Sequence, residues 1–141
     1  MSARLAFDYV IVQVVPRVDR DERLNVGVIL FCPAAAFLGA TITDDLTRVR
    51  ALAPDLDAGA VERQLEAIRA ICAGRAHAGP IALLSASERF HWLSAPRSTV
   101  VQPAAAHAGL CTDPADALAR LFRAVVGLER GQPLVAAKPR Q

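Results

Sequence analysis

The first third of the chain has the alternating pattern of β-strands. In residues 7–15 three valines fall on one face and the residues between them on the other, and Asp8 is the only charge. Two further uncharged runs, 25–31 and 37–43, are rich in strand-forming residues and are separated by a Pro-Ala turn. Because the connections are short, the three segments are predicted to pair as an antiparallel meander.

The uncharged stretch 24–43 has the length of a membrane-spanning helix, about 20 residues. Pro33 lies in its middle and Gly27 and Gly39 flank it, so two strands fit the pattern better than one helix. Asp8 stands where a secretory signal would need apolar residues. The sequence therefore predicts a cytoplasmic protein with no membrane partner.

Helical periodicity follows in three places. A short helix is expected over 46–52, after a cap at Asp44 or Asp45 and before Pro54. A longer helix runs from Asp57 to a stop at Gly74. Its apolar stripe is Val61, Leu65, Ile68 and Cys72.

The last helix has the clearest boundaries. Asp113 suits the N-cap and Pro114 the first helical position, and Gly127 suits the stop. Its stripe is Leu118, Leu121, Phe122 and Val125.

Between the helices, strands are predicted over 89–93, 98–102 and 107–111, separated by prolines. The fold class is therefore α+β, a single domain over 1–128 that consists mainly of antiparallel sheet with two or three helices packed on one face. Residues 129–141 have no periodic pattern and are predicted to be a flexible tail.

Composition narrows the class of function. The 141 residues include 16 basic and 14 acidic ones, a formal charge of +2, so one domain is expected and nucleic acid is not the default partner. Three cysteines without Cys-x-x-Cys spacing predict neither a disulfide framework nor a zinc site and favour a reducing compartment. No metal or cofactor is expected, and the oligomeric state is left open.

Two blocks of residues together resemble an uncharacterised bacterial family, domain of unknown function 3037. They are residues 7–17 with Glu22 and 25–28, and residues 89–102 followed by 107–110 and 113–114. The resemblance implies a small cytoplasmic bacterial protein with no assigned reaction, and it suggests a HipA-like kinase as partner. It supplies no catalytic residues.

The sequence Arg97-Ser98-Thr99 is the first candidate for chemistry, since a guanidinium beside two hydroxyls can hold a phosphate or carboxylate. The alternative is a turn in which Arg97 meets a local carboxylate. Asn25, with Glu22, can line a site at the end of the first hairpin, or it can simply begin a strand by bonding to backbone.

His107 and Cys111 stand four apart, which on a strand places them on one face about 13 Å apart. That distance is too long for direct proton transfer, so Cys111 is expected to be a buried structural residue.

Two hypotheses of function remain open. The first is a non-catalytic accessory or binding protein, associated with a HipA-like kinase. The second is an enzyme or nucleic-acid-processing factor whose anion-binding site is assembled from six polar residues: Arg17, Asn25, Arg97, Ser98, Thr99 and His107. Convergence of these side chains in one pocket would favour the second hypothesis, and dispersal would favour the first.

Overall fold

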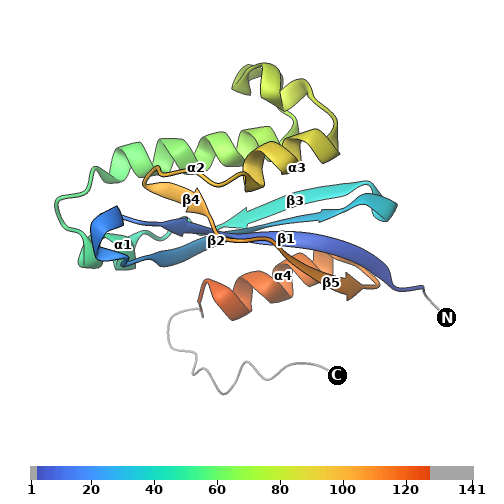
Figure 1. The fold of residues 1–141 in the computed structure, drawn as a ribbon, viewed down its shortest axis with the longest axis horizontal. Coiled ribbons are helices and arrows are strands. Elements are labelled where there is room, and N and C mark those ends of the chain that lie inside the picture. Colours follow the sequence, from blue (N-terminus) through green and yellow to red (C-terminus); the bar gives the residue numbers. More distant parts are fainter. Residues whose placement is uncertain (1–2, 128–141) are drawn as a thin grey trace.

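The computed structural model describes residues 3–127, and its centre is an antiparallel sheet (Figure 1). The predicted meander is confirmed as β1 (Leu5–Val14), β2 (Leu24–Cys32) and β3 (Phe37–Ile42). The other side of β1 pairs with β5 (His107–Cys111) along its first half and with β4 (Val101–Pro103) near its end. The described part of the sheet therefore has five strands, with β1 in the interior.

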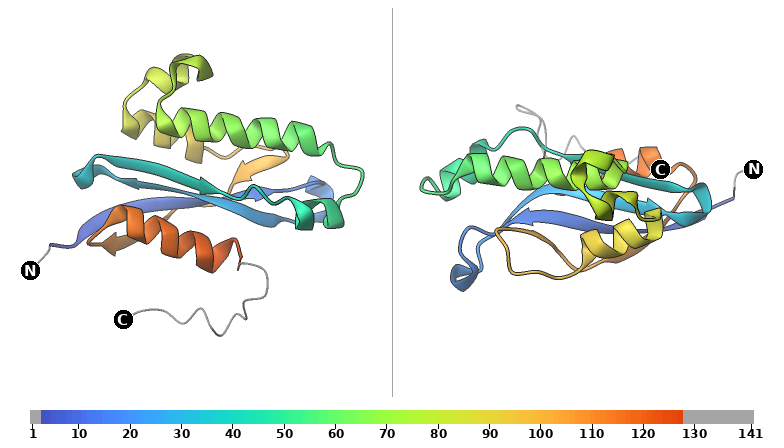
Figure 2. Two further views of the ribbon diagram at one scale, coloured as in Figure 1. Left: turned by 180° about the vertical axis from the view of Figure 1, so that it is seen from behind. Right: turned by 90° about the horizontal axis from the view of Figure 1, so that it is seen from above.

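The helices cover both faces of this sheet. Figures 1 and 2 show α2 (Ala58–Ala73) and α3 (Ala86–Ser94) on one side and α4 (Pro114–Val125) on the other. A short helix, α1 (Thr47–Leu52), follows β3. The α+β class is confirmed, but the expectation that the helices share one face is wrong for α4.

The reason lies in the strands, which are apolar on both faces. One buried cluster lies between the sheet and α2 and α3, and includes Val10, Val12, Val14, Ile29, Val61, Leu65, Phe90 and Leu93. A second cluster lies on the α4 side and includes Phe7, Val28, Leu30, Cys32, Cys111, Ala117 and Leu118. Each apolar face needs its own cover, because exposing it to water would cost free energy.

The predicted boundaries of α2 and α4 are confirmed. Asp57 accepts from the amide of Ala60 at 3.1 Å, and Gly74 ends α2 with φ 72°. Asp113 accepts from the first amides of α4. Within the predicted stripe of α4, Leu118 is buried, while the other three members are only half-buried.

The segment predicted as a strand over 89–93 is instead part of α3. Ser85 and Glu88 form a reciprocal capping box, which satisfies amides at the helix start. Phe90 and Leu93, three residues apart, then bury one helix face, and the Phe90 ring stacks on Phe31 at 5.4 Å. The Ser-x-x-Glu spacing was the sequence signal for this helix.

The strand predicted over 98–102 begins later, at Val101, and includes Pro103. Proline fits there because β4 is an edge strand and Pro103 lies opposite Val12, at a position where the missing N–H would face away from the sheet. The strand predicted over 107–111 is confirmed as β5. The predicted tail, 129–141, lies outside the described residues.

Candidate functional site

Arg97 closes the C-terminal end of α3. Its Nη2 donates to the Trp92 carbonyl at 2.5 Å and its Nε to the Ala95 carbonyl at 3.3 Å, and both carbonyls lie at the helix end, where intrahelical donors run out. Its Cζ lies 4.6 Å from the centre of the Trp92 ring, within cation–π distance. The guanidinium thus holds its own turn through carbonyls and a ring, and not through the carboxylate that the sequence suggested.

The pair formed by Trp92 and Arg97 is partly exposed to solvent. Trp92 is 40% exposed, whereas its neighbours Phe90 and Leu93 are buried. Partial burial lowers the pKa of Arg97, and no acidic side chain in residues 3–127 forms an ion pair with it. Arg97 is therefore a fixed cation, held against an aromatic ring without a carboxylate to balance its charge.

The two hydroxyls beside Arg97 point to local structure or solvent. Thr99 Oγ1 donates to the Val101 carbonyl at 2.6 Å, and Ser98 is exposed. The Val15 amide donates to the Val100 carbonyl at 2.7 Å, so this segment runs beside the end of β1. The segment therefore continues the sheet pairing and does not fold over Arg97.

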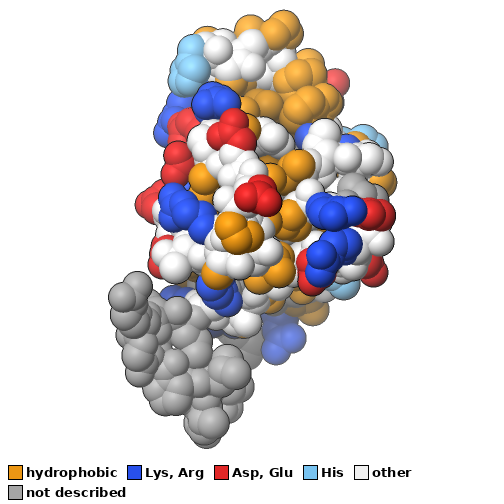
Figure 3. All heavy atoms as spheres, turned by 90° about the vertical axis from the view of Figure 1, so that its left-hand side faces the viewer, with side chains coloured by type: hydrophobic (Ala, Val, Ile, Leu, Met, Phe, Trp, Pro, Cys, Tyr) orange, Lys and Arg blue, Asp and Glu red, His pale blue; other side chains and the backbone are white. Residues whose placement is uncertain are grey.

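Arg17 lies in the charged connection between β1 and β2. It donates to Asp19 at 2.8 Å, and this hydrogen bond raises the pKa of Arg17 and lowers that of Asp19. Similar pairs join Arg20 to Glu22 and Arg23 to Asp21. Figure 3, which looks onto this end of the molecule, shows acidic and basic side chains side by side. The arginines of this loop are thus balanced by near neighbours.

Asn25 links the sheet to α4 through its side-chain amide. Its Nδ2 donates to the Val125 carbonyl at 2.9 Å, and its Oδ1 accepts from Gln13 at 2.9 Å. The first bond joins β2 to a carbonyl at the end of α4, which has no helical donor of its own. Asn25 therefore fixes the helix end to the sheet.

His107 is exposed at the start of β5, and its ring lies 5.3 Å from the Tyr9 ring. Cys111, on the same face of β5, is buried, as predicted. Burial, followed by the neighbouring Cys32, raises the pKa of the Cys111 thiol. The histidine ring thus packs on a tyrosine, while the thiol is buried beside Cys32.

The six predicted site residues are thus dispersed over the molecule. Asn25 and His107 face the α4 side of the sheet, Arg97 packs on α3 across it, and Arg17 pairs with Asp19 in a loop. No hydrogen bond or ion pair within residues 3–127 joins any two of the six. Their role in binding stays a prediction.

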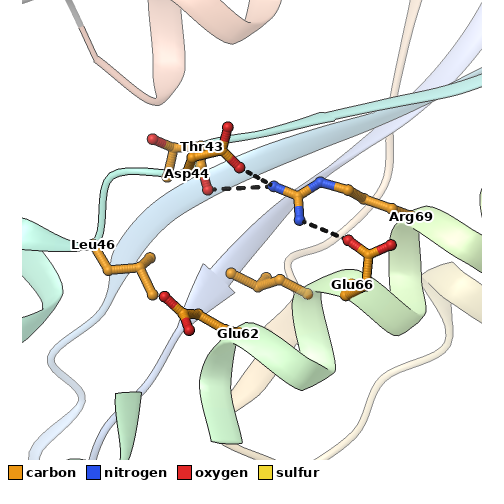
Figure 4. A pocket seen from close by; sticks show the side chains of 7 residues that line it. Thr43, Asp44, Leu46, Glu62, Glu66 and Arg69 are labelled. Atoms are coloured by element: carbon orange, nitrogen blue, oxygen red, sulfur yellow. Dashed lines mark hydrogen bonds and ion pairs between the residues drawn. The ribbon is translucent and has the colours of Figure 1, made fainter. Parts of the chain in front are cut away.

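A shallow pocket of about 300 Å³ lies elsewhere, between α2 and the chain that leaves β3 (Figure 4). Its lining consists of Thr43, Asp44, Leu46, Glu62, Leu65, Glu66 and Arg69. None of these residues was singled out as a site, because at the sequence level the charges of α2 read only as a solvated helix face.

Arg69 spans this pocket. It donates to Asp44 at 3.0 Å and to Glu66 at 3.3 Å (Figure 4), and also to the Ile42 carbonyl at 3.1 Å. Glu66 also accepts from Arg75 at 3.3 Å. The guanidinium thereby joins α2 to the end of β3, so the polar groups of the pocket are engaged mainly with one another.

No three metal-ligating side chains within residues 3–127 are grouped so as to hold a metal ion. Over the same range, none of the helices combines the length and apolar character needed to cross a membrane.

Fold and site together define a small α+β protein with helices on both faces of an antiparallel sheet and an exposed Trp–Arg pair. Residues 9–126 match the family described as "Protein of unknown function (DUF3037)", and the chain belongs to this family. The resemblance seen in the sequence is thus confirmed. No curated protein matches the chain, and no solved structure matches it either.

Proposed function

We propose that this protein is a non-catalytic accessory protein of the bacterial cytoplasm, and that it binds a protein partner through Trp92 and Arg97. The observation that carries the proposal is the stacked pair at the end of α3, with a ring 40% exposed and a cation that no described carboxylate balances. Tryptophan and arginine are the residue types most enriched among side chains that dominate binding energy.

The pair is ordered before any partner arrives. Two carbonyl contacts and the ring hold the guanidinium in place, so less side-chain entropy is lost on binding. A partner surface with an aspartate or glutamate next to an apolar residue would complement both groups at once. The expected partner therefore presents an acidic and apolar segment.

The partner to test first is a HipA-like kinase, which the family resemblance suggests. The dispersal of Arg17, Asn25, Arg97 and His107 over different faces favours a binding protein over the alternative of an enzyme or nucleic-acid-processing factor. Cytoplasmic location and the absence of a catalytic function are parts of the same proposal.

The test begins with affinity purification of the tagged protein from its native cell, followed by binding measurements on the purified kinase or on whichever partner is recovered. Arg97→Ala and Trp92→Ala should each weaken binding at least about tenfold, which corresponds to about 1.4 kcal/mol. Arg63→Ala, an exposed arginine on α2, is the matched control and should bind as the wild type does.

Stability measurements separate this role from a structural one. Arg97→Ala loses two exposed hydrogen bonds and a cation–π contact, so its free energy of unfolding should fall by only about 1–2 kcal/mol. A folded Arg97→Ala variant that binds the partner with unchanged affinity would refute the proposed surface.

A further inference from the structure

The outer edge of β5 is an open edge of the sheet. β5 pairs with β1 on one side, and no strand in residues 3–127 pairs with its other side (Figure 1). Its sequence, His-Ala-Gly-Leu-Cys, has no lysine, proline or acidic residue. Edge strands usually carry such residues because an open row of backbone groups recruits other strands.

At the other two edges of the sheet, single positions are blocked, although β3 (Phe-Leu-Gly-Ala-Thr-Ile) also lacks lysine, proline and acidic residues. On β4, Pro103 stands at a position where its missing N–H would point outward. On β3, Arg69 donates to the Ile42 carbonyl at 3.1 Å and occupies the end of the edge. Of the two edges without such residues, β5 has the exposed apolar side chain, because Leu110 is 58% exposed whereas Phe37 and Leu38 of β3 are half-buried.

The register shows which backbone groups point outward. The Ile11 carbonyl accepts from Ala104 and the Val15 amide donates to Val100, so odd-numbered residues of β1 turn their backbone groups toward β4 and β5. Phe7 lies opposite Gly109, and the backbone groups of Gly109 therefore point inward. Those of Ala108 and Leu110 point to solvent.

We infer that the β5 edge pairs with β5 of a second copy of this chain, antiparallel, about a two-fold axis at Gly109. The strand is self-complementary in this arrangement, because Ala108 lies opposite the partner copy's Leu110 and the two residues exchange both backbone hydrogen bonds. The Leu110 side chain, 58% exposed, then packs on a small residue of the other copy. Neither strand carries an Asp, Glu, Lys or Arg side chain that would repel the second copy.

The contact is short, only five residues on each side. An interface below about 1,200 Å² is typical of weak or transient association, so the dimer should form at high protein concentration and dissociate on dilution. The inference does not depend on the proposed function, because Trp92 and Arg97 lie on α3 and its C-terminal turn and not on β5.

Sedimentation velocity on the full chain from about 10 µM to about 1 mM tests the inference. The wild type should move toward the dimer as concentration rises. Ala108→Pro removes an outward amide without touching the pairing to β1, and Leu110→Lys adds a charge, so both variants should remain monomeric. Leu83→Lys is the matched control, because Leu83 is a leucine 68% exposed in another element, and this variant should still dimerise.

Circular dichroism confirms that each variant is folded. A wild type that stays monomeric over the whole range would overturn the inference, and so would a folded Leu110→Lys variant that dimerises like the control. Partner binding by the monomeric variants, measured in the same preparations, reports on the proposed function separately.

Discussion

Leu118→Ala tests whether the α4 face of the sheet is a true core. Leu118 is 6% exposed and belongs to the cluster formed with Val28, Leu30 and Cys32. Truncation removes three buried carbon atoms, worth about 2.4 kcal/mol at about 0.8 kcal/mol each. The space left behind adds to this cost.

The surroundings of Leu118 determine how much of the cavity persists. A Cβ built on Gly39 of β3 would lie 3.1 Å from Leu118 Cδ2, so the leucine packs directly against strand backbone. Backbone held in a sheet relaxes less than a side chain does, and the cavity should remain largely open. The free energy of unfolding is therefore expected to fall by about 3–4 kcal/mol.

Leu121→Ala is the matched control on the same helix. Leu121 is only half-buried, so the same truncation should cost about 1–1.5 kcal/mol. Urea unfolding followed by circular dichroism gives both values, provided that the slopes agree with that of the wild type. Equal losses for the two variants, or a larger loss for Leu121→Ala, would refute the packing described for α4.

Two further predictions concern the other side of the sheet. Burial raises the pKa of the Cys72 thiol to about 12, above the ordinary value of 9.0, so between these values the unfolded chain loses a proton that the folded protein keeps. Between pH 9.0 and about 12 the free energy of unfolding of the wild type should therefore fall with pH more steeply than that of Cys72→Ala, by about 1.4 kcal/mol per pH unit. The same pH dependence for both proteins, measured by urea unfolding, would contradict this. Gly27→Ala should destabilise by about 1–3 kcal/mol, because its Cβ would lie 2.7 Å from Ile42 Cγ1 and 3.0 Å from the Thr41 carbonyl oxygen; an unchanged thermal midpoint would show that β3 moves freely.

The candidate site was only partly predictable. The sequence identified Arg97 as a candidate for anion binding, but its acceptors are the carbonyls of Trp92 and Ala95. These carbonyls are available to Arg97 only because α3 ends there. Asn25 could be read as a strand start, yet its bond to the Val125 carbonyl joins positions 100 residues apart. No local pattern encodes a partner at that separation.

The amino-acid sequence by itself determined the elements whose signals are local. The period-two runs predicted β1, β2 and β3, and Asp57 with Gly74 marked the limits of α2. For α3 the residues 89–93 by themselves favour a strand, whereas the capping box of Ser85 and Glu88 just before them starts a helix.

Only the tertiary structure decided which face of the sheet each helix covers. An amphipathic stripe shows that α4 must bury one side, and it says nothing about which of two apolar sheet faces will receive it. That choice depends on the pairing of β5 with β1, which places the start of α4 at the Phe7 end of the sheet, and on the bond from Asn25 that fixes its other end. Burial and pairing between distant segments are properties of the folded chain as a whole, and they placed α4 opposite α2 and α3.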